Sequence, residues 1–243
     1  MRSAALDITM PALSLLLLLQ SGAALAVSVG QSDDFEDGTR QAWEMGFIDA
    51  TTNNMTNIAD GGPAVAGDNY LEVVADGTQV AGGRLTFFNR SQWSGDYIGA
   101  GITAIALDVS NIASSAPLNL RLAIDGGFSD PDNPGSFIGG LFATSASTTL
   151  ESGTGWTHAV FSLLPADLTP VSGRSGVAGN DVLAALGNVT ELRLLNSELP
   201  DWNGLPVSAT LGIDNIQAVP LPPTALLFGS GLLGLGIWQR RRR

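Results

Sequence analysis

The sequence predicts an all-β protein, an antiparallel β-sandwich, and three observations support this fold class. Short runs in which apolar and polar side chains alternate recur along the interior, as in PLNLRLAID at 117–125. Turn-forming residues separate these runs, and the chain contains 30 Gly and 12 Pro. No long stretch has the period of an amphipathic helix, and only segment 180–188 suggests a short one.

The N-terminal segment, residues 1–26, has the three parts of a secretory signal peptide. Arg2 supplies the positive end, and Leu13–Leu19 form an apolar core too short to span a bilayer. Ala24 and Ala26 form a small-x-small cleavage site, which predicts a cut before Val27. We therefore expect signal peptidase and the export machinery as partners.

The body, residues 27–218, is the predicted sandwich and contains about ten strands. Leu118, Leu120, Leu122 and Ile124 share one face of their strand, which is the pattern of a half-buried strand. The expected strands are 33–37, 43–47, 70–74, 84–88, 102–110, 117–125, 137–145, 156–163, 189–195 and 209–219. Regularly punctuated short strands of this kind are typical of a single sandwich domain.

The composition of the chain excludes some chemistry and some partners. The chain has no cysteine, so disulfides, thiolate zinc sites and cysteine nucleophiles are excluded. Residues 27–219 contain six arginines against 22 acidic side chains, a formal charge of −16. Such a body repels nucleic acid and anionic lipid and attracts cations, so we expect no nucleic-acid partner.

The C-terminal segment, residues 219–243, combines a proline motif, an apolar stretch and a basic end. The 15 uncharged residues from Thr224 to Trp238 would make a helix of about 22 Å, at about 1.5 Å per residue, against a hydrocarbon core of about 30 Å. Four basic residues follow and would hold the end in the cytoplasm by the positive-inside rule: Arg240, Arg241, Arg242 and Arg243. We expect a single transmembrane sorting helix.

This tail resembles a known family of sorting signals. The stretch Val219, Pro220, Leu221 and Pro222, followed by GLLGLG and the arginine cluster, is similar to the VPLPA-type PEP-CTERM signals of Gram-negative bacteria. The resemblance implies processing by an exosortase, a membrane protease or transpeptidase linked to exopolysaccharide production. The protein would be held transiently in the inner membrane and then reach the cell surface or the medium. Pro223 and Thr224 depart from the pattern, which usually has Ala at this point.

Two other interpretations of the tail stay open. LPPTA at 221–225 also resembles the Leu-Pro-x-Thr signal of Gram-positive sortases, although Ala225 replaces the usual Gly. A permanent membrane anchor would have the same orientation without cleavage. The exosortase interpretation is favoured because the apolar stretch begins directly after the motif and lysine is absent.

Three stretches of the body resemble galactose-binding and carbohydrate-binding-module jelly rolls. They are DDFEDGTRQAWEMG at 33–46, GWTHAVFSL at 155–163 and LGIDNIQAV at 211–219. The resemblance implies that the first and last strands are neighbours and that one structural calcium ion binds between them. Glu36 and Asp214 are the implied ligands.

Aromatic residues are the candidates for sugar stacking, because flat rings suit the apolar faces of sugars. Trp93 and Trp202 stand in loop-like contexts and are the better candidates for binding a ligand, although packing within the protein is the favoured interpretation for both. Trp43 and Trp156 stand in strands and are assigned to the core. His158, the single histidine, lies in a strand on the face of Trp156, and no GxSxG motif occurs. We expect no enzyme activity.

The sequence thus favours an exported, tail-sorted surface or matrix protein with a non-catalytic sandwich, associated with exopolysaccharide. The alternative is a lectin-like carbohydrate-binding module with a structural calcium. A glycan hydrolase is the remote third hypothesis, because acidic residues are plentiful but no pair is singled out.

Overall fold

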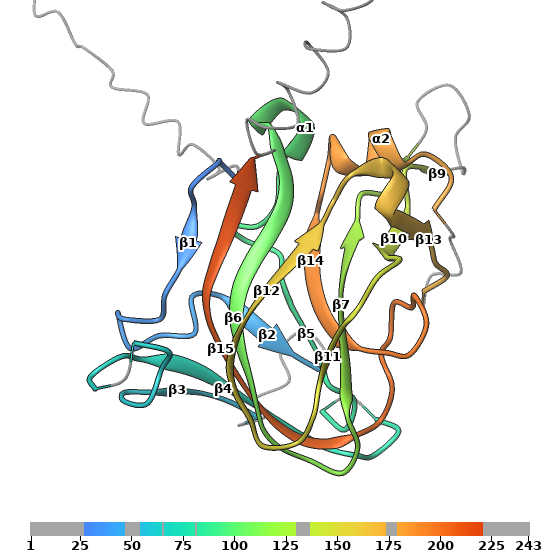
Figure 1. The fold of residues 1–243 in the computed structure, drawn as a ribbon. Helices are drawn as coiled ribbons and strands as arrows, with labels where there is room; N and C mark the ends of the chain where they lie inside the picture. Colours follow the sequence, from blue (N-terminus) through green and yellow to red (C-terminus); the bar gives the residue numbers. More distant parts are fainter. Residues whose placement is uncertain are drawn as a thin grey trace, which may run out of the picture.

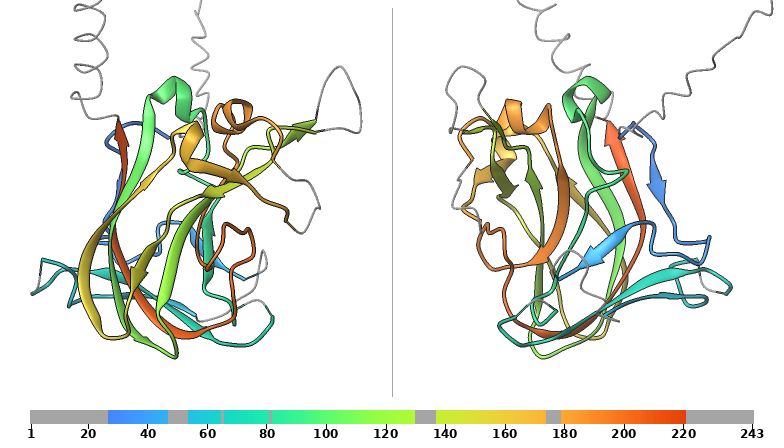
Figure 2. Two further views of the ribbon diagram at one scale, coloured as in Figure 1. Left: turned by 45° about the vertical axis from the view of Figure 1, so that its right-hand side comes forward. Right: turned by 180° about the vertical axis from the view of Figure 1, so that it is seen from behind.

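The computed structural model describes residues 27–46, 54–64, 66–80, 82–129, 137–173 and 179–220. These residues form an all-β sandwich of two antiparallel sheets, as expected (Figure 1). Figure 2 shows the two layers in two other views, with β6 and β15 in one layer and β7 and β14 in the other. The signal peptide, including Ala24 and Ala26, lies outside the described residues.

The first sheet has six strands, and its longest members lie at its centre. Their order is β12 (Thr154–Ser162), β6 (Ile102–Ser114), β15 (Ser208–Pro220), β4 (Tyr70–Asp76) and β3 (Met55–Ile58), with β1 (Ser32–Asp33) added to β15. The pairing of Ser32 with Gln217 and of Asp33 with Ile216 makes the first and last strands neighbours. The neighbouring first and last strands expected from the jelly-roll resemblance are confirmed.

The second sheet has seven strands. Their order is β13 (Leu168–Pro170), β10 (Leu141–Thr144), β7 (Leu118–Asp125), β14 (Glu191–Asn196), β5 (Thr86–Asn89) and β2 (Trp43–Met45), with β11 (Thr148–Leu150) added to β7. A separate pair is formed by β8 (Phe128–Ser129) and β9 (Phe137–Ile138). Three short helical turns complete the described fold: α1 (Tyr97–Ala100), η1 (Pro165–Asp167) and α2 (Val182–Leu186).

The core lies between the inner faces of the sheets. Arg121 and Ala123 on the outer face of β7 are buried, so this strand is not half-buried as the alternation predicts. Leu118, Leu120, Leu122 and Ile124 on its inner face are each at most 1% exposed, as expected. They face apolar residues of the six-stranded sheet such as Leu107 and Leu211 within one hydrophobic cluster. Burial of these alternate side chains is what stabilises the pairing of the two layers.

Two differences from the expected elements have physical causes. The described residues contain 15 strands rather than about ten, because strands of two or three residues are too short to show a periodic pattern. The expected strand 137–145 is divided into β9 and β10 because Gly139 and Gly140 have φ values of +84° and +92°. Glycine adopts this backbone conformation without the steric cost that other residues incur.

Candidate functional site

The candidate site begins with a pair of aromatic rings on the outer face of the six-stranded sheet, the face turned away from the core. Trp156 of β12 and Tyr70 of β4 are both partly buried, and their ring centroids lie 5.4 Å apart with the planes at 77°. The Trp156 indole Nε1 donates a hydrogen bond of 2.9 Å to the Gly61 carbonyl. The bond and the edge-on contact together fix the orientation of the indole ring.

Gly212 makes room for this aromatic pair. It pairs with Glu72 of β4 and with Ser110 of β6, so it lies in the middle of the sheet. A Cβ atom at Gly212 would lie 2.9 Å from Cη2 of Trp156 and 3.3 Å from Cδ2 of Tyr70. The two rings therefore rest on a strand position that only glycine leaves open.

A row of polar side chains crosses the same face beside the rings. His158, Asp108 and Asp214 are directly paired across β12, β6 and β15. The His158 Nδ1 lies 2.9 Å from an oxygen of Asp108, and the Asn215 amide donates to Asp108 at 3.0 Å and to Asp214 at 3.2 Å. Asn215 has a φ of +49° at a bulge in β15, which turns its amide toward the two carboxylates.

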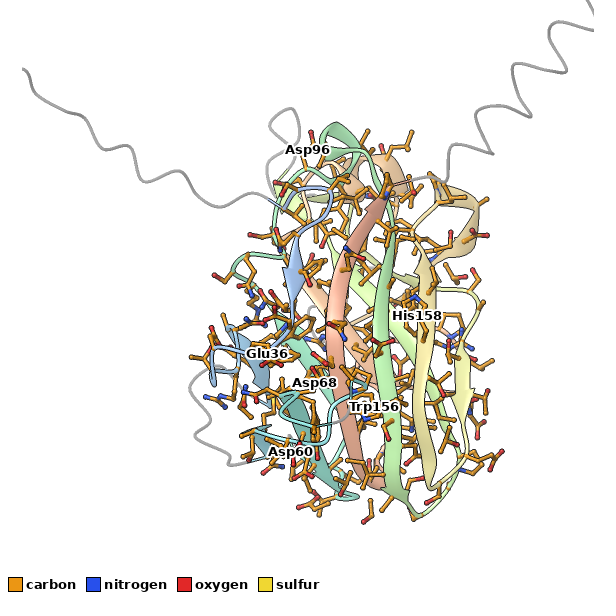
Figure 3. The ribbon with its side chains drawn as sticks, turned by 60° about the vertical axis from the view of Figure 1, so that its left-hand side comes forward. Glu36, Asp60, Asp68, Asp96, Trp156 and His158 are labelled. Atoms are coloured by element: carbon orange, nitrogen blue, oxygen red, sulfur yellow. The ribbon has the colours of Figure 1, made fainter. Side chains whose placement is uncertain are left out.

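The loop between β3 and β4 brings further carboxylates to the aromatic pair. We call residues 59–64 and 66–69 the acidic loop. Asp60 accepts a hydrogen bond from the Gly67 backbone N–H at 2.7 Å, and Asp68 accepts one from the Ala64 N–H at 2.6 Å. Figure 3 shows Asp60 and Asp68 on the side of Trp156 that faces Glu36, with His158 further along the sheet.

Asp214 is the most perturbed carboxyl group of this face. Its residue is only 1% exposed, and burial raises its pKa to about 7, although the hydrogen bond from the Asn215 N–H opposes the shift. The negative charges of Asp68, Asp108 and Glu36 raise the pKa further. The ion pairs formed by the described residues include none between Asp214 and an arginine.

The calcium ligands implied by the sequence, Glu36 and Asp214, lie on the same side of the molecule. Their donor chemistry suits calcium, because the groups near Asp214 are carboxylate oxygens and calcium takes oxygen ligands. However, no three His, Asp or Glu side chains of the described residues come together as a metal site. Glu36 accepts a hydrogen bond from the Asn69 N–H at 2.8 Å, which fastens the first turn to the acidic loop. Calcium binding stays a prediction.

Trp93, one of the two tryptophans predicted to bind ligand, is 0% exposed. Its Nε1 donates a hydrogen bond of 2.6 Å to Asp33, and the Trp43 Nε1 donates to the same oxygen at 2.8 Å. Trp93 therefore belongs to the core and offers no ring face to a sugar. The surrounding SQWSGDY sequence is polar because the chain turns there, and the indole points inward from the turn.

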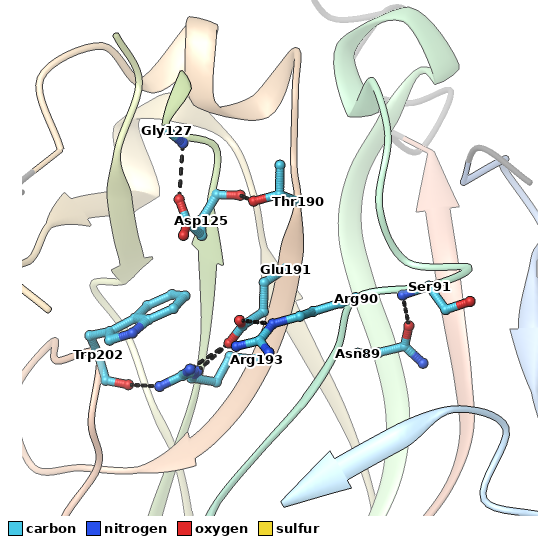
Figure 4. Close-up of polar contacts among 9 residues, drawn as sticks. All are labelled: Asn89, Arg90, Ser91, Asp125, Gly127, Thr190, Glu191, Arg193 and Trp202. Atoms are coloured by element: carbon cyan, nitrogen blue, oxygen red, sulfur yellow. Dashed lines mark hydrogen bonds and ion pairs between the residues drawn. The ribbon is translucent and has the colours of Figure 1, made fainter. Parts of the chain in front are cut away.

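Trp202, the other predicted ligand residue, lies on the outer face of the seven-stranded sheet and is 6% exposed. The Arg193 guanidinium lies 3.9 Å from its ring centroid and donates a hydrogen bond of 2.8 Å to the Trp202 carbonyl. Figure 4 shows Arg193 and Arg90 both bound to the carboxylate of Glu191. One side of the Trp202 ring is thus already covered by an arginine of the same chain.

The sequence interpretation missed the aromatic pair and assigned Trp156 to the core. In β12 the buried residues are Ala159 and Phe161, and Trp156 shares the outer face with His158 and Val160, whose exposure is 59%. The face shared with His158 was visible in the sequence, and the polar histidine was the signal that this face is the exposed one. Tyr70 and Gly212 had no such signal, because their contact depends on the order of strands in the sheet.

Most of the predicted sorting residues lie outside the part of the chain that the structure describes. Leu221, Pro222 and the four terminal arginines lie outside the described residues, whereas Val219 and Pro220 form the end of β15 and pair with Ala104 and Ile102. The strand thus extends two residues past the expected boundary at 218. Within the described part of the chain, no helix is long and apolar enough to cross a membrane.

Comparisons with known proteins concern the fold. No family model matches the chain, and no curated protein matches it. A family 11 carbohydrate-binding module from Clostridium thermocellum, solved with a β-1,3-1,4-mixed-linked tetrasaccharide, is 18% identical over 79% of this chain and 97% of its own, with a TM-score of 0.44. A tandem of family 22 carbohydrate-binding modules from Paenibacillus barcinonensis is 16% identical over 83% of this chain and 48% of its own, also with a TM-score of 0.44.

An adhesin domain is also similar in structure. The cleaved adhesin domain of Lys-gingipain from Porphyromonas gingivalis is 10% identical over 80% of this chain and 100% of its own, with a TM-score of 0.41. Carbohydrate-binding-module β-sandwiches are therefore among the solved structures that this chain resembles. At these identities and TM-scores the likeness assigns no ligand to this chain.

Proposed function

We propose that the sandwich is a non-catalytic glycan-binding domain whose site is the Trp156–Tyr70 pair on the outer face of the six-stranded sheet. The observation that carries the proposal is this partly exposed aromatic pair, seated over Gly212 and bordered by hydrogen-bonding side chains. The C–H face of a sugar ring packs against an aromatic ring, while its hydroxyl groups need polar partners around the ring.

The polar partners lie within the same face. Ionised carboxylates accept hydrogen bonds from sugar hydroxyls, and the side chain of Asp108 is 21% exposed beside the aromatic pair. His158, whose side chain is 63% exposed, holds Asp108 through Nδ1 and leaves Nε2 directed away from that bond. A few polar groups placed near an aromatic ring are what fixes the orientation of a bound ligand.

We propose further that this domain is exported and is processed at its tail by an exosortase-type enzyme, so that it works on the cell surface or in the matrix among exopolysaccharides. The tripartite tail and the signal-peptide pattern support this proposal. The intact mass of the protein from its native host tests it. A mass ending near Val219 to Thr224 is expected, whereas a membrane-bound mass that runs to Arg243 contradicts processing.

A glycan array followed by calorimetry tests the binding function. Wild-type protein is expected to bind at least one polysaccharide class without releasing sugar, and Trp156→Ala is expected to abolish that binding. Val160→Ala is the matched control, because Val160 is an exposed residue of the same strand and face. Equal binding by wild type and Trp156→Ala would place any glycan elsewhere and overturn the proposed site.

A further inference from the structure

The aromatic pair lies in a surface of unbalanced negative charge. Glu72 pairs with Gly212 under the rings, Asp108 lies in the neighbouring row, and the acidic loop adds Asp60 and Asp68. The one ion pair of this face within the described residues joins Asp108 to His158, and the histidine is charged only when protonated. Any ligand on the rings is therefore surrounded by carboxylates.

Most arginines of the described residues are engaged elsewhere. Arg90 and Arg193 share Glu191, Arg84 donates to the Gly204 carbonyl, and Arg121 is surrounded by backbone carbonyls on the seven-stranded sheet. Arg40 is exposed in the turn after β1, and no ion pair joins it to a carboxylate of the described residues. The charge around the rings is thus left for a ligand to balance.

On the basis of the proposed glycan function, we infer that the ligand of the Trp156–Tyr70 site is an amino-sugar glycan with free, protonated amino groups, and that polyuronates are excluded. The Trp156 and Tyr70 rings bind the sugar ring by stacking, and the nearby carboxylates favour a sugar that carries a positive charge. An ammonium group donates charge-assisted hydrogen bonds to carboxylates, which are roughly twice as strong as neutral ones. An N-acetyl group at the same sugar position removes this charge, and a uronate brings a repulsive one.

Glu72 is the best position at which to change the charge alone. Its side chain is partly exposed beside Tyr70, whose pKa is raised by burial and by the charge of Glu72. Among the described residues the Glu72 carboxylate makes no hydrogen bond, so Glu72→Gln keeps the shape of the face. This variant separates electrostatic selection from the stacking that Trp156 provides.

The experiment is calorimetric titration with four oligosaccharides of equal length at about pH 6, where sugar amines are protonated. They are oligomers of glucosamine, of N-acetylglucosamine, of glucose and of galacturonate. The glucosamine oligomer is expected to bind about tenfold tighter than its N-acetylated form, which corresponds to about 1.4 kcal/mol. The difference should shrink between about 0.05 M and about 0.5 M salt, since screening weakens exposed charges.

The variants distinguish the possible results. Glu72→Gln should reduce the preference for the amine several-fold, Trp156→Ala should abolish all binding, and Val160→Ala should change nothing. Equal or tighter binding of the N-acetylated or neutral oligomer would overturn the inference and leave the glycan function standing. Glucosamine oligomers that bind Trp156→Ala as tightly as wild type would show mere adsorption to charge, which also overturns it. No binding of any of the four oligomers would also overturn the inference, and the glycan array then tests the proposed function separately.

Discussion

At the scale of single residues, Asp33 ties the first strand to the core. Its carboxylate accepts hydrogen bonds from the indoles of Trp43 and Trp93 and from the side-chain amide of Gln92, at 2.6 to 3.0 Å. Burial raises the pKa of Asp33, although these three hydrogen bonds oppose the shift by stabilising its charged form. A buried carboxylate with three donors leaves three unsatisfied groups when it is removed.

Replacing Asp33 is therefore expected to be costly. Asp33→Ala should lower the free energy of unfolding by about 3 kcal/mol, because buried donors lose a charged partner. Asp34→Ala is the matched control, since Asp34 is exposed and accepts only a long bond of 3.3 Å from the Glu36 N–H. Denaturant unfolding of both variants measures the difference, and equal stabilities would contradict the role of Asp33.

Asp214 predicts a dependence of stability on pH. Its folded-state pKa of about 7 lies above the ordinary value of 3.8, so the folded protein binds the proton more tightly than the unfolded chain. Its contribution to stability is therefore full below about pH 4 and is lost as the pH rises through 7. The charges that face Asp214 are those of Glu36, Asp68 and Asp108, the last of which is paired with His158.

The test compares wild type with Asp214→Asn in the presence of a chelator. The variant should gain stability relative to wild type as the pH rises from about 5 to about 8, because the amide cannot ionise in a buried position. Denaturant unfolding at several pH values gives this difference directly. A difference that does not vary with pH would mean that Asp214 is already charged in the folded protein at about pH 5.

At the scale of elements, β15 connects the stability of the fold to the proposed site. It pairs with β1, β4 and β6, and it carries both Gly212 under the aromatic rings and Asp214 in the polar row. These two residues are two positions apart in regularly paired strand, so they lie on the same outer face, and the bulge at Asn215 follows them. The strand thus serves as the floor of the site.

Gly212→Ala should disturb the site with little effect on the fold. The added Cβ would press on the Trp156 ring at 2.9 Å, whereas alanine itself is tolerated in a strand and changes stability by about 1 kcal/mol at most. Gly155→Ala in β12 is the control, because a Cβ there would meet no atom within 4 Å. Glycan affinity should fall in the first variant only, and unchanged affinity in both would contradict the ring geometry.

Calcium binding would also act at the level of elements, because the ion would connect the turn after β1 to strand β15. We expect calcium to raise the melting temperature of chelator-treated protein by a few degrees, as for any ligand that binds only the folded state. Asp214→Asn should remove the effect. Absence of both binding heat and a melting shift in wild type would exclude the site.

The elements also show what the sequence could and could not predict. The alternation in β7 was readable because one face is uniformly leucine or isoleucine, and the closing strand was readable from its alternating apolar residues. In β12, Trp156 and Val160 on one face are as apolar as Ala159 and Phe161 on the other, so His158 was the one residue that distinguished the exposed face. The site escaped prediction for a related reason, since Tyr70 and Trp156 meet only through a strand order that no local pattern encodes.

At the scale of the whole molecule, charge and architecture divide the surface into two kinds of face. The described arginines that form ion pairs do so on the seven-stranded sheet, where Arg193 covers Trp202. The outer face of the six-stranded sheet keeps exposed carboxylates and the aromatic pair. The formal charge of −16 for residues 27–219 was predictable from composition. The composition could not predict that the ion-paired arginines lie on a different sheet from the carboxylates around the aromatic pair.

The most direct test of the central claim is an NMR titration that follows the indole N–H signals of the five tryptophans while a binding glycan is added. The signal of Trp156, assigned through Trp156→Phe, is expected to shift at saturation, whereas those of Trp43 and Trp93 stay in place because both rings are buried. A shift of the Trp202 signal with Trp156 unmoved would contradict the account, because it would place the glycan on the seven-stranded sheet.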